Sequence, residues 1–146
     1  MELALKTIGD EESFQVFRSL LKSSNLPADN LDFRKDLLVG YVEDGVMVGT
    51  GGLEIYGEYG LLRSLSVKLG TRGKALGTAI TEYLIDQARK RNLKGIYLLT
   101  ETAHGFFLRK GFMDVSREEV PSSLKASSEF SYVCGPSAVA MHLPII

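Results

Sequence analysis

The residues best suited to chemistry lie where an apolar segment runs into a glycine-rich loop, at Val67 to Thr78. This pattern predicts a strand, a loop and then a helix, and the first N–H groups of a helix have no partner within it. Those N–H groups and the positive end of the helix dipole stabilise a phosphate. Arg72 and Lys74 add positive charge, while Gly73 and Gly77 let the backbone approach a ligand closely. The alternative is a turn before an ordinary helix, with two solvated basic side chains.

The loop lacks the Gly-Lys-Ser/Thr string of a Walker loop and the Gly-x-Gly-x-x-Gly string of a Rossmann fold. Glycine itself is the unusual feature of the composition, with 15 among 146 residues and ten of these between residues 40 and 77. Apart from the loop, we expect turns at Gly45, Gly57 and Gly60, and close approach of a substrate at Gly49, Gly51 and Gly52.

Hydrophobic periodicity indicates the elements that position this loop. The order is a strand and helices, then an antiparallel meander, then strand–helix–strand units, which predicts one mixed α/β sheet. Asp44-Gly45 predicts a hairpin turn of type I′. The polar insertion at 118–137 is either a lid or a loosely packed loop. Strands are predicted at 2–8, 37–43, 46–56, 61–69, 95–100, 113–117 and 138–143, and helices at 10–24, 29–36, 76–92 and 102–110.

Composition excludes several classes of protein. The chain has the length of one domain, 1–146, and its formal charge of -1 argues against a nucleic-acid binder. A single cysteine, Cys134, excludes an intrachain disulfide and a cysteine-built zinc site, and we expect no metal. No apolar run approaches the ~18 residues of a membrane span, and the N-terminus does not read as a signal peptide. The expected location is the cytoplasm.

Two motifs resemble one known family. Leu65 to Val67 followed by Arg72 to Gly77 resembles motif A of the GNAT N-acetyltransferases, Arg/Gln-x-x-Gly-x-Gly/Ala. Thr102 to Phe112 resembles motif B, usually Ala-x-x-Phe-Tyr-x-x-x-Gly-Phe. The motifs stand in the family's order and separation. The resemblance implies a mixed, mostly antiparallel sheet flanked by helices, in which parallel strands four and five splay apart and admit the pantetheine arm of acetyl-CoA.

The resemblance also implies which residues bind acetyl-CoA, and that the N–H of Leu65 or Val67 polarises the thioester carbonyl. Ala75 stands where the family usually has glycine and keeps its N–H donor. Phe107 stands where the family often has a tyrosine general acid, and phenylalanine has no proton to give to the departing thiolate. The implied cosubstrate residues are Leu65, Ser66, Val67, Arg72, Gly73, Lys74, Ala75, Leu76, Gly77, Thr78, Phe106, Phe107 and Arg109.

Further strings narrow the expected acceptor. Four strings resemble small acetyltransferases associated with arsenic resistance: Gly52 to Gly57, Leu62 to Leu65, Pro121 to Phe130 and Cys134 to Ala138. They are partly similar to the acetyltransferase domain of N-acetylglutamate synthases. Both resemblances imply a small amine acceptor, such as an amino acid or its analogue, and a homodimer is a further possibility by analogy with the family. The alternative function is a non-catalytic acyl-CoA-binding or regulatory module, which the phenylalanine at 107 favours.

Acetylation of an amine needs a general base, because an amine at neutral pH is mostly ammonium. We expect Glu54 to be the base because it lies in a strand beside glycines; the alternative is that it faces solvent. His104 is expected on a helix surface and His142 as an ordinary strand residue. The other candidates for the base are Glu101 and Glu129.

Three residues are candidates for binding the acceptor. Arg63 interrupts an apolar strand and either binds a substrate carboxylate or pairs with Glu54 across the hairpin. Cys134 either lines the acceptor pocket or is a small buried apolar residue. Glu129, in the polar insertion, is the third candidate.

Overall fold

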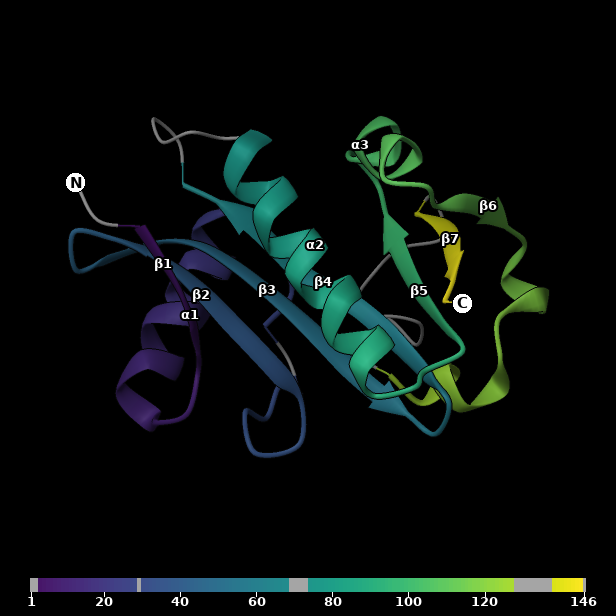
Figure 1. The fold of residues 1–146 in the computed structure, drawn as a ribbon, viewed down its shortest axis with the longest axis horizontal. Helices are drawn as coiled ribbons and strands as arrows, with labels where there is room; N and C mark the ends of the chain where they lie inside the picture. The colour runs from purple at the N-terminus through teal and green to yellow at the C-terminus, as the bar shows by residue number, and fades with distance from the viewer. Residues whose placement is uncertain (1–2, 29, 69–73, 128–137, 146) are drawn as a thin grey trace.

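A computed structural model describes residues 3–28, 30–68, 74–127 and 138–145 (Figure 1). Its strands form one mixed sheet in the order β1-β2-β3-β4-β5-β7-β6, which confirms the predicted fold class. Three α-helices and two short 3₁₀ helices complete the described fold: α1 (Glu11–Ser23), α2 (Lys74–Lys90), α3 (His104–Arg109), η1 (Arg117–Glu119) and η2 (Ser122–Ala126). The strands are β1 (Leu3–Thr7), β2 (Leu37–Glu43), β3 (Val46–Tyr56), β4 (Tyr59–Val67), β5 (Gly95–Thr100), β6 (Met113–Val115) and β7 (Val139–Pro144).

Helices α1 and α2 cover opposite faces of the sheet. Neighbouring strand residues point to opposite faces, and in β2 Leu38 belongs to the apolar cluster with α1 whereas Val39 belongs to the cluster with α2. Figure 1 shows α2 lying across β3 and β4. The carboxylate of Asp10 caps α1 by accepting the Ser13 N–H at 2.7 Å. The central strands therefore bury side chains on both faces of the sheet, one face against α1 and the other against α2.

The hairpin between β2 and β3 confirms the predicted type I′ turn. Asp44 has φ +49° and Gly45 has φ +84°, as this turn requires. The helix predicted at 29–36 is wrong, because the described part of that segment forms turns. Hydrogen bonds between side chains and nearby backbone N–H groups compete with helix formation there. The Asp36 carboxylate accepts the Asp32 N–H at 3.1 Å, and the Asp32 carboxylate accepts the Arg34 N–H at 2.9 Å.

The glycines of β3 make room for packing within the protein. A Cβ at Gly51 would overlap Cγ2 of Ile80 in α2, and one at Gly49 would lie 3.0 Å from Cδ1 of the same side chain. A Cβ at Gly52, on the other face, would lie 3.0 Å from Leu38. Our expectation that these glycines admit a substrate is wrong, because Ile80 and Leu38 occupy the space beside them.

The central feature of the sheet is the separation of β4 from β5. The two strands are parallel and pair only from Tyr59–Leu61 to Gly95–Tyr97. Beyond these residues β5 pairs with β7 alone, along its whole length. The sheet therefore consists of β1 to β4 on one side and β5, β7 and β6 on the other, and the two parts diverge past Leu61 (Figure 1).

A β-bulge bends β4 where this divergence begins. Thr50 pairs with Ser66 and Gly52 pairs with Arg63, so two residues of β4 face Gly51 alone. Ser64, one of those two, has φ +64°. An L-residue is strained in this left-handed conformation, which makes the bulge a feature that needs support from its surroundings.

The described part of the insertion is better packed than the sequence indicated. Its two 3₁₀ helices bury Val120 and Leu124 in a cluster with Leu61, Tyr97 and Ala140. Residues 118–127 are therefore anchored on the sheet, and our expectation of a loosely packed loop is wrong for this part. The remaining residues of the insertion, 128–137, lie outside the described structure.

Candidate active site

The larger cavity of the described structure lies between the diverging ends of β4 and β5. Its volume is about 680 Å³. Leu62, Leu65 and Leu98 from the two strands and Phe107 from α3 give it apolar walls. The segment after α1, residues 24–27, and the residues between β5 and α3 close its ends. A cavity with apolar walls between two strands suits a largely apolar ligand.

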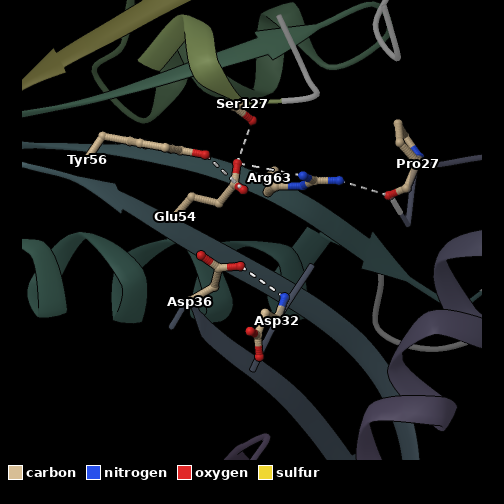
Figure 2. A network of polar contacts seen from close by, with 7 residues as sticks. All are labelled: Pro27, Asp32, Asp36, Glu54, Tyr56, Arg63 and Ser127. Carbon is tan, nitrogen blue, oxygen red and sulfur yellow. Dashed lines mark hydrogen bonds and ion pairs between the residues drawn. The ribbon is translucent and has the colours of Figure 1, made fainter. Parts of the chain in front are cut away.

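Glu54 lies at the centre of a buried polar network (Figure 2). Its side chain is 2% exposed, so the alternative that it faces solvent is wrong. Ser127 Oγ donates to Glu54 Oε1 at 2.7 Å, and Tyr56 Oη donates to Oε2 at 3.2 Å. Arg63 Nη1 lies 3.6 Å from Oε1. A buried polar side chain needs such partners to replace the water that it loses.

Arg63 extends this network to the larger cavity. Its side chain is fully buried, and Nη2 donates to the carbonyl oxygen of Pro27 at 3.3 Å (Figure 2). The pairing of Arg63 with Glu54 across the hairpin is thus one of the two arrangements that the sequence left open. Arg63 is also one of the residues that line the larger cavity.

A second, smaller cavity lies on the other side of the ion pair. It has a volume of about 370 Å³ and is mainly polar, with Asp32, Lys35, Tyr56 and Ser127 among its lining residues. Glu54 lines this smaller cavity and Arg63 lines the larger one. The Glu54–Arg63 pair therefore lies between the two cavities, and each cavity is lined by one residue of the pair.

The carboxylate of Glu54 affects the titration of its neighbours. Burial, with a further contribution from the negative charge of Glu54, raises the pKa of the Tyr56 hydroxyl, which keeps that hydroxyl a donor. Burial also raises the pKa of Asp36, and the charge of Glu54 again contributes. Burial is the main cause of both shifts, and the nearby negative charge of Glu54 adds to each.

The predicted phosphate loop is described only at its two ends. Val67 ends β4, and Lys74 is the first residue of α2, whereas Arg72 and Gly73 lie outside the described residues. Leu65 lines the larger cavity, and the Ser66 hydroxyl contacts the hydroxyl of Ser24 at 2.6 Å. In the first turn of α2, Ala75 is exposed, Leu76 and Gly77 are buried and Thr78 is half-buried.

Helix α3 contributes aromatic rings to the site. Phe107 is 5% exposed and lines the larger cavity, with its ring centroid 5.1 Å from Phe106 and 5.5 Å from Phe112. A Cβ at Gly77 would lie 3.6 Å from the ring of Phe106, so this glycine brings α2 close to α3. Arg109 is exposed in the last turn of α3.

The other candidates for a general base lie in different settings. His104 Nε2 lies 2.6 Å from Asp114 Oδ1 in a hydrogen bond at the surface, as expected for a helix-surface residue. Glu101 is exposed at the edge of the larger cavity. Glu129 and Cys134 lie outside the described residues.

The sequence analysis missed Tyr56, Ser64 and Ser127. Tyr56 was detectable, because it lies two residues after Glu54 in one strand and therefore shares its face of the sheet. Ser127 carries no local signal, since 73 residues separate it from the carboxylate it binds. Ser64 could not be detected either, because the sequence of its strand gives no sign of the bulge.

Comparison with known proteins identifies the family. The sequence model of the acetyltransferase (GNAT) family matches residues 8–112. The chain therefore belongs to this family, a family of acetyl-CoA-dependent N-acetyltransferases, as its two motifs predicted.

Solved structures share the fold at low sequence identity. An N-acetylglutamate synthase from Neisseria gonorrhoeae, solved with coenzyme A and N-acetyl-glutamate, has a TM-score of 0.78 at 14% identity; the match covers 100% of this chain and 36% of that one. This chain thus spans about a third of that relative's length. A GNAT acetyltransferase from Staphylococcus aureus has a TM-score of 0.76 at 18% identity, with 98% and 100% covered. A Mycobacterium tuberculosis protein solved with CoA has a TM-score of 0.74 at 18% identity, with 98% and 99% covered.

Two features are absent from the described residues. Among residues 3–28, 30–68, 74–127 and 138–145, no helix is long and apolar enough to cross a membrane. The same residues contain no group of three or more histidine, cysteine, aspartate or glutamate side chains placed to hold a metal ion.

Proposed function

We propose that this protein transfers the acetyl group of acetyl-CoA to the amine of a small amino acid or a close analogue of one. Membership of the acetyltransferase (GNAT) family supports the reaction type. The fold shared with an N-acetylglutamate synthase solved with coenzyme A and N-acetyl-glutamate supports an acceptor that carries both an amine and a carboxylate.

The cosubstrate occupies the larger cavity in this proposal. Its apolar walls suit the pantetheine arm, and the N–H of Leu65 or Val67 polarises the thioester carbonyl as an oxyanion hole does. The start of α2 binds the pyrophosphate, because free N–H groups and a positive dipole meet there. The contributing residues are Ser66, Arg72, Gly73, Lys74, Ala75, Leu76, Gly77 and Thr78, with Phe106, Phe107 and Arg109 on the α3 side.

The observation that carries the acceptor assignment is the Glu54–Arg63 pair between the two cavities. An amino acid has an ammonium and a carboxylate within one small molecule, and this pair holds the two complementary charges at the boundary between the two cavities. Arg63 binds the carboxylate of the acceptor, and Glu54 accepts the proton that the ammonium must lose. Glu129 and Cys134 complete the acceptor pocket in this proposal.

The transfer then follows a balanced sequence of bond changes. The lone pair of the free amine forms a bond to the thioester carbonyl carbon, and the tetrahedral intermediate expels the sulfur with the electrons of the carbon–sulfur bond. Glu54 holds the first proton, lost by the ammonium before attack, and water takes the second proton from the nitrogen of the tetrahedral intermediate. The products are the N-acetylated acceptor and the CoA thiolate. The N–H of Leu65 or Val67 stabilises the oxyanion of the intermediate in this proposal.

The test measures release of free thiol from acetyl-CoA with a panel of amino acids and with their carboxamides as matched controls. We expect free amino acids to accelerate release and the carboxamides to be weaker acceptors by about ten- to a hundredfold in kcat/KM, since a charge-assisted hydrogen bond contributes about 1.5–3 kcal/mol. Equal activity with carboxamides would contradict the role of Arg63. No acceleration by any amine would contradict the transferase.

The second candidate function is a non-catalytic acyl-CoA-binding module. Phe107 favours it, because the described α3 presents a phenyl ring to the cavity where related enzymes often carry a tyrosine hydroxyl. This candidate predicts tight binding of acetyl-CoA with no acceleration of thiol release by any amine. Calorimetric titration with acetyl-CoA, run beside the thiol assay, separates the two functions.

A further inference from the structure

Ser64 carries a hydroxyl whose position the fold does not explain. The residue is 8% exposed and lines the larger cavity. Its Oγ is buried, and among the described residues it has no hydrogen-bond partner. Because most buried polar groups in proteins have a partner, a buried hydroxyl without one, on a residue that lines a cavity, indicates a partner that a ligand supplies.

The backbone at Ser64 is strained, and this strained conformation positions the hydroxyl. Ser64 adopts φ +64° in the β-bulge of β4, a conformation that glycine would adopt without strain. The hydroxyl of Thr50 in β3 donates to the Ser64 carbonyl oxygen at 2.7 Å within the protein interior. This bond fixes the bulge in one conformation, as expected where strain is retained at a functional site.

The position of Ser64 matches a chemical need of the proposed reaction. The cavity that it lines receives the acyl thioester in that proposal, and the breaking carbon–sulfur bond leaves negative charge on sulfur. Phe107 lines the same cavity from α3, but its side chain has no hydroxyl that could donate a hydrogen bond to that sulfur. Ser64 lies where β4 and β5 separate, with a donor that has no other described use.

We propose that the Ser64 hydroxyl donates a hydrogen bond to the sulfur of CoA as the thiolate leaves. This inference rests on the proposed function, and it supplies the stabilisation that Phe107 cannot give. The sulfur departs with both electrons of the carbon–sulfur bond, Ser64 keeps its proton, and the thiolate later takes a proton from water. Ser64 is then a catalytic residue, and Thr50 is the residue that positions it.

The variants are chosen to separate the hydroxyl from the backbone. Ser64→Gly removes the hydroxyl and relieves the left-handed strain, whereas Ser64→Ala removes the hydroxyl and keeps the strain. Thr81→Val is the matched control, because Thr81 Oγ1 is another buried hydroxyl without a partner among the described residues, on α2 and outside both cavities.

The first measurement is the titration of the CoA thiol bound to each protein, followed by the ultraviolet absorbance of the thiolate. A hydrogen bond to the anion favours ionisation, so both Ser64 variants are expected to lower the acid dissociation constant of bound CoA by about tenfold. Thr81→Val should titrate like the wild type. Bound CoA that titrates identically in the wild type and both Ser64 variants would overturn the proposal.

The second measurement is the turnover number, with a hydroxyl restored on the α3 side by Phe107→Tyr. Both Ser64 variants should lose about tenfold or more in kcat. Phe107→Tyr should raise kcat by a larger factor in the Ser64→Gly background than in the wild type. Full activity of Ser64→Gly would overturn the proposal, because only the backbone conformation would then matter. If the wild type acetylates no amine while the thiol titration still depends on Ser64, the transferase function fails and the sulfur contact stands. A wild type that binds no CoA overturns both.

Discussion

At the scale of single residues, the network around Glu54 combines a buried charge with a complete set of partners. Two hydroxyls and one guanidinium surround its carboxylate, and the guanidinium is itself bound by the Pro27 carbonyl. Each group depends on the others, since the removal of one partner leaves an uncompensated charge in the interior. The network therefore behaves as a unit in stability as well as in binding.

This dependence predicts a non-additive pair of variants. Glu54→Gln and Arg63→Met are each expected to lower the free energy of unfolding by about 3–5 kcal/mol, because each leaves one buried charge without its opposite. The double variant should cost less than the sum of the two, since it removes both charges together. Chemical denaturation of the four proteins measures the coupling, and strict additivity would mean that the two side chains do not sense each other.

His142 gives a prediction about pH. Its ring stacks on Tyr97 with centroids 4.2 Å apart, and burial lowers its pKa below the ordinary value of 6.5. As the pH falls, the unfolded chain binds this proton first. The stability that the neutral ring contributes is therefore complete above 6.5 and is lost as the pH falls through the folded pKa.

The variant that checks this pH dependence is His142→Phe, because it keeps an aromatic ring against Tyr97 and removes the titrating group. We expect the free energy of unfolding of the wild type, measured relative to the variant, to fall from pH 7 toward pH 5. A constant difference over that range would show that the histidine titrates alike in the folded and unfolded states.

At the scale of elements, the contact of α2 with β3 depends on the absence of a side chain. Gly51→Ala would drive a methyl group into Ile80 and is expected to lower the free energy of unfolding by about 1–3 kcal/mol. Ile80→Leu moves the branch away from Cβ, so the alanine should cost less in that background. Gly9→Ala is the control, because a Cβ there meets nothing within 4 Å. Equal costs at positions 9 and 51 in thermal unfolding would contradict the close contact.

The elements were the part of the fold that the sequence predicted best. Turn chemistry at Asp44-Gly45 and the apolar spacing of α1 and α2 are local signals, and each corresponds to an observed element. The helix expected at 29–36 failed because aspartate side chains there bind nearby backbone N–H groups. The bulge in β4 could not be predicted, because it depends on Thr50 from the neighbouring strand.

At the scale of the whole molecule, the proposed cosubstrate contacts both parts of the divided sheet. A ligand that binds only the folded state raises its stability, by about 2.7 kcal/mol at a hundred times its Kd. We therefore expect CoA to raise the melting temperature of the wild type. Arg72→Glu with Lys74→Glu should remove that rise and leave the melting temperature of the free protein nearly unchanged, since the change reverses the charge of the phosphate loop.

The control for the loop is the exposed pair Lys90→Glu and Arg89→Glu at the other end of α2. That variant carries the same change in net charge and should still be stabilised by CoA. Loss of the CoA effect in both double variants would mean that overall charge, and not the loop, governs binding.

The candidate site was predictable only in part. Glu54 and Arg63 were recognisable because charged residues interrupt apolar strands, and the structure brings them within 3.6 Å. Their partners Ser127 and Pro27 come from distant parts of the chain, and no periodicity links them to β3 or β4. The two cavities depend on how far β4 and β5 diverge, which is a property of the assembled sheet.

The walls of the two cavities also bear on how such a protein can change its acceptor in evolution. The apolar slot is built from β4 and β5, whose side chains also form the core, so few substitutions there preserve the fold. The smaller cavity, beside Glu54, is lined largely by connecting segments, at Asn30, Leu31, Asp32, Lys35 and Ser127. Connections tolerate substitution far better than strands do. New acceptor specificities can therefore arise on these segments while acetyl-CoA remains the donor.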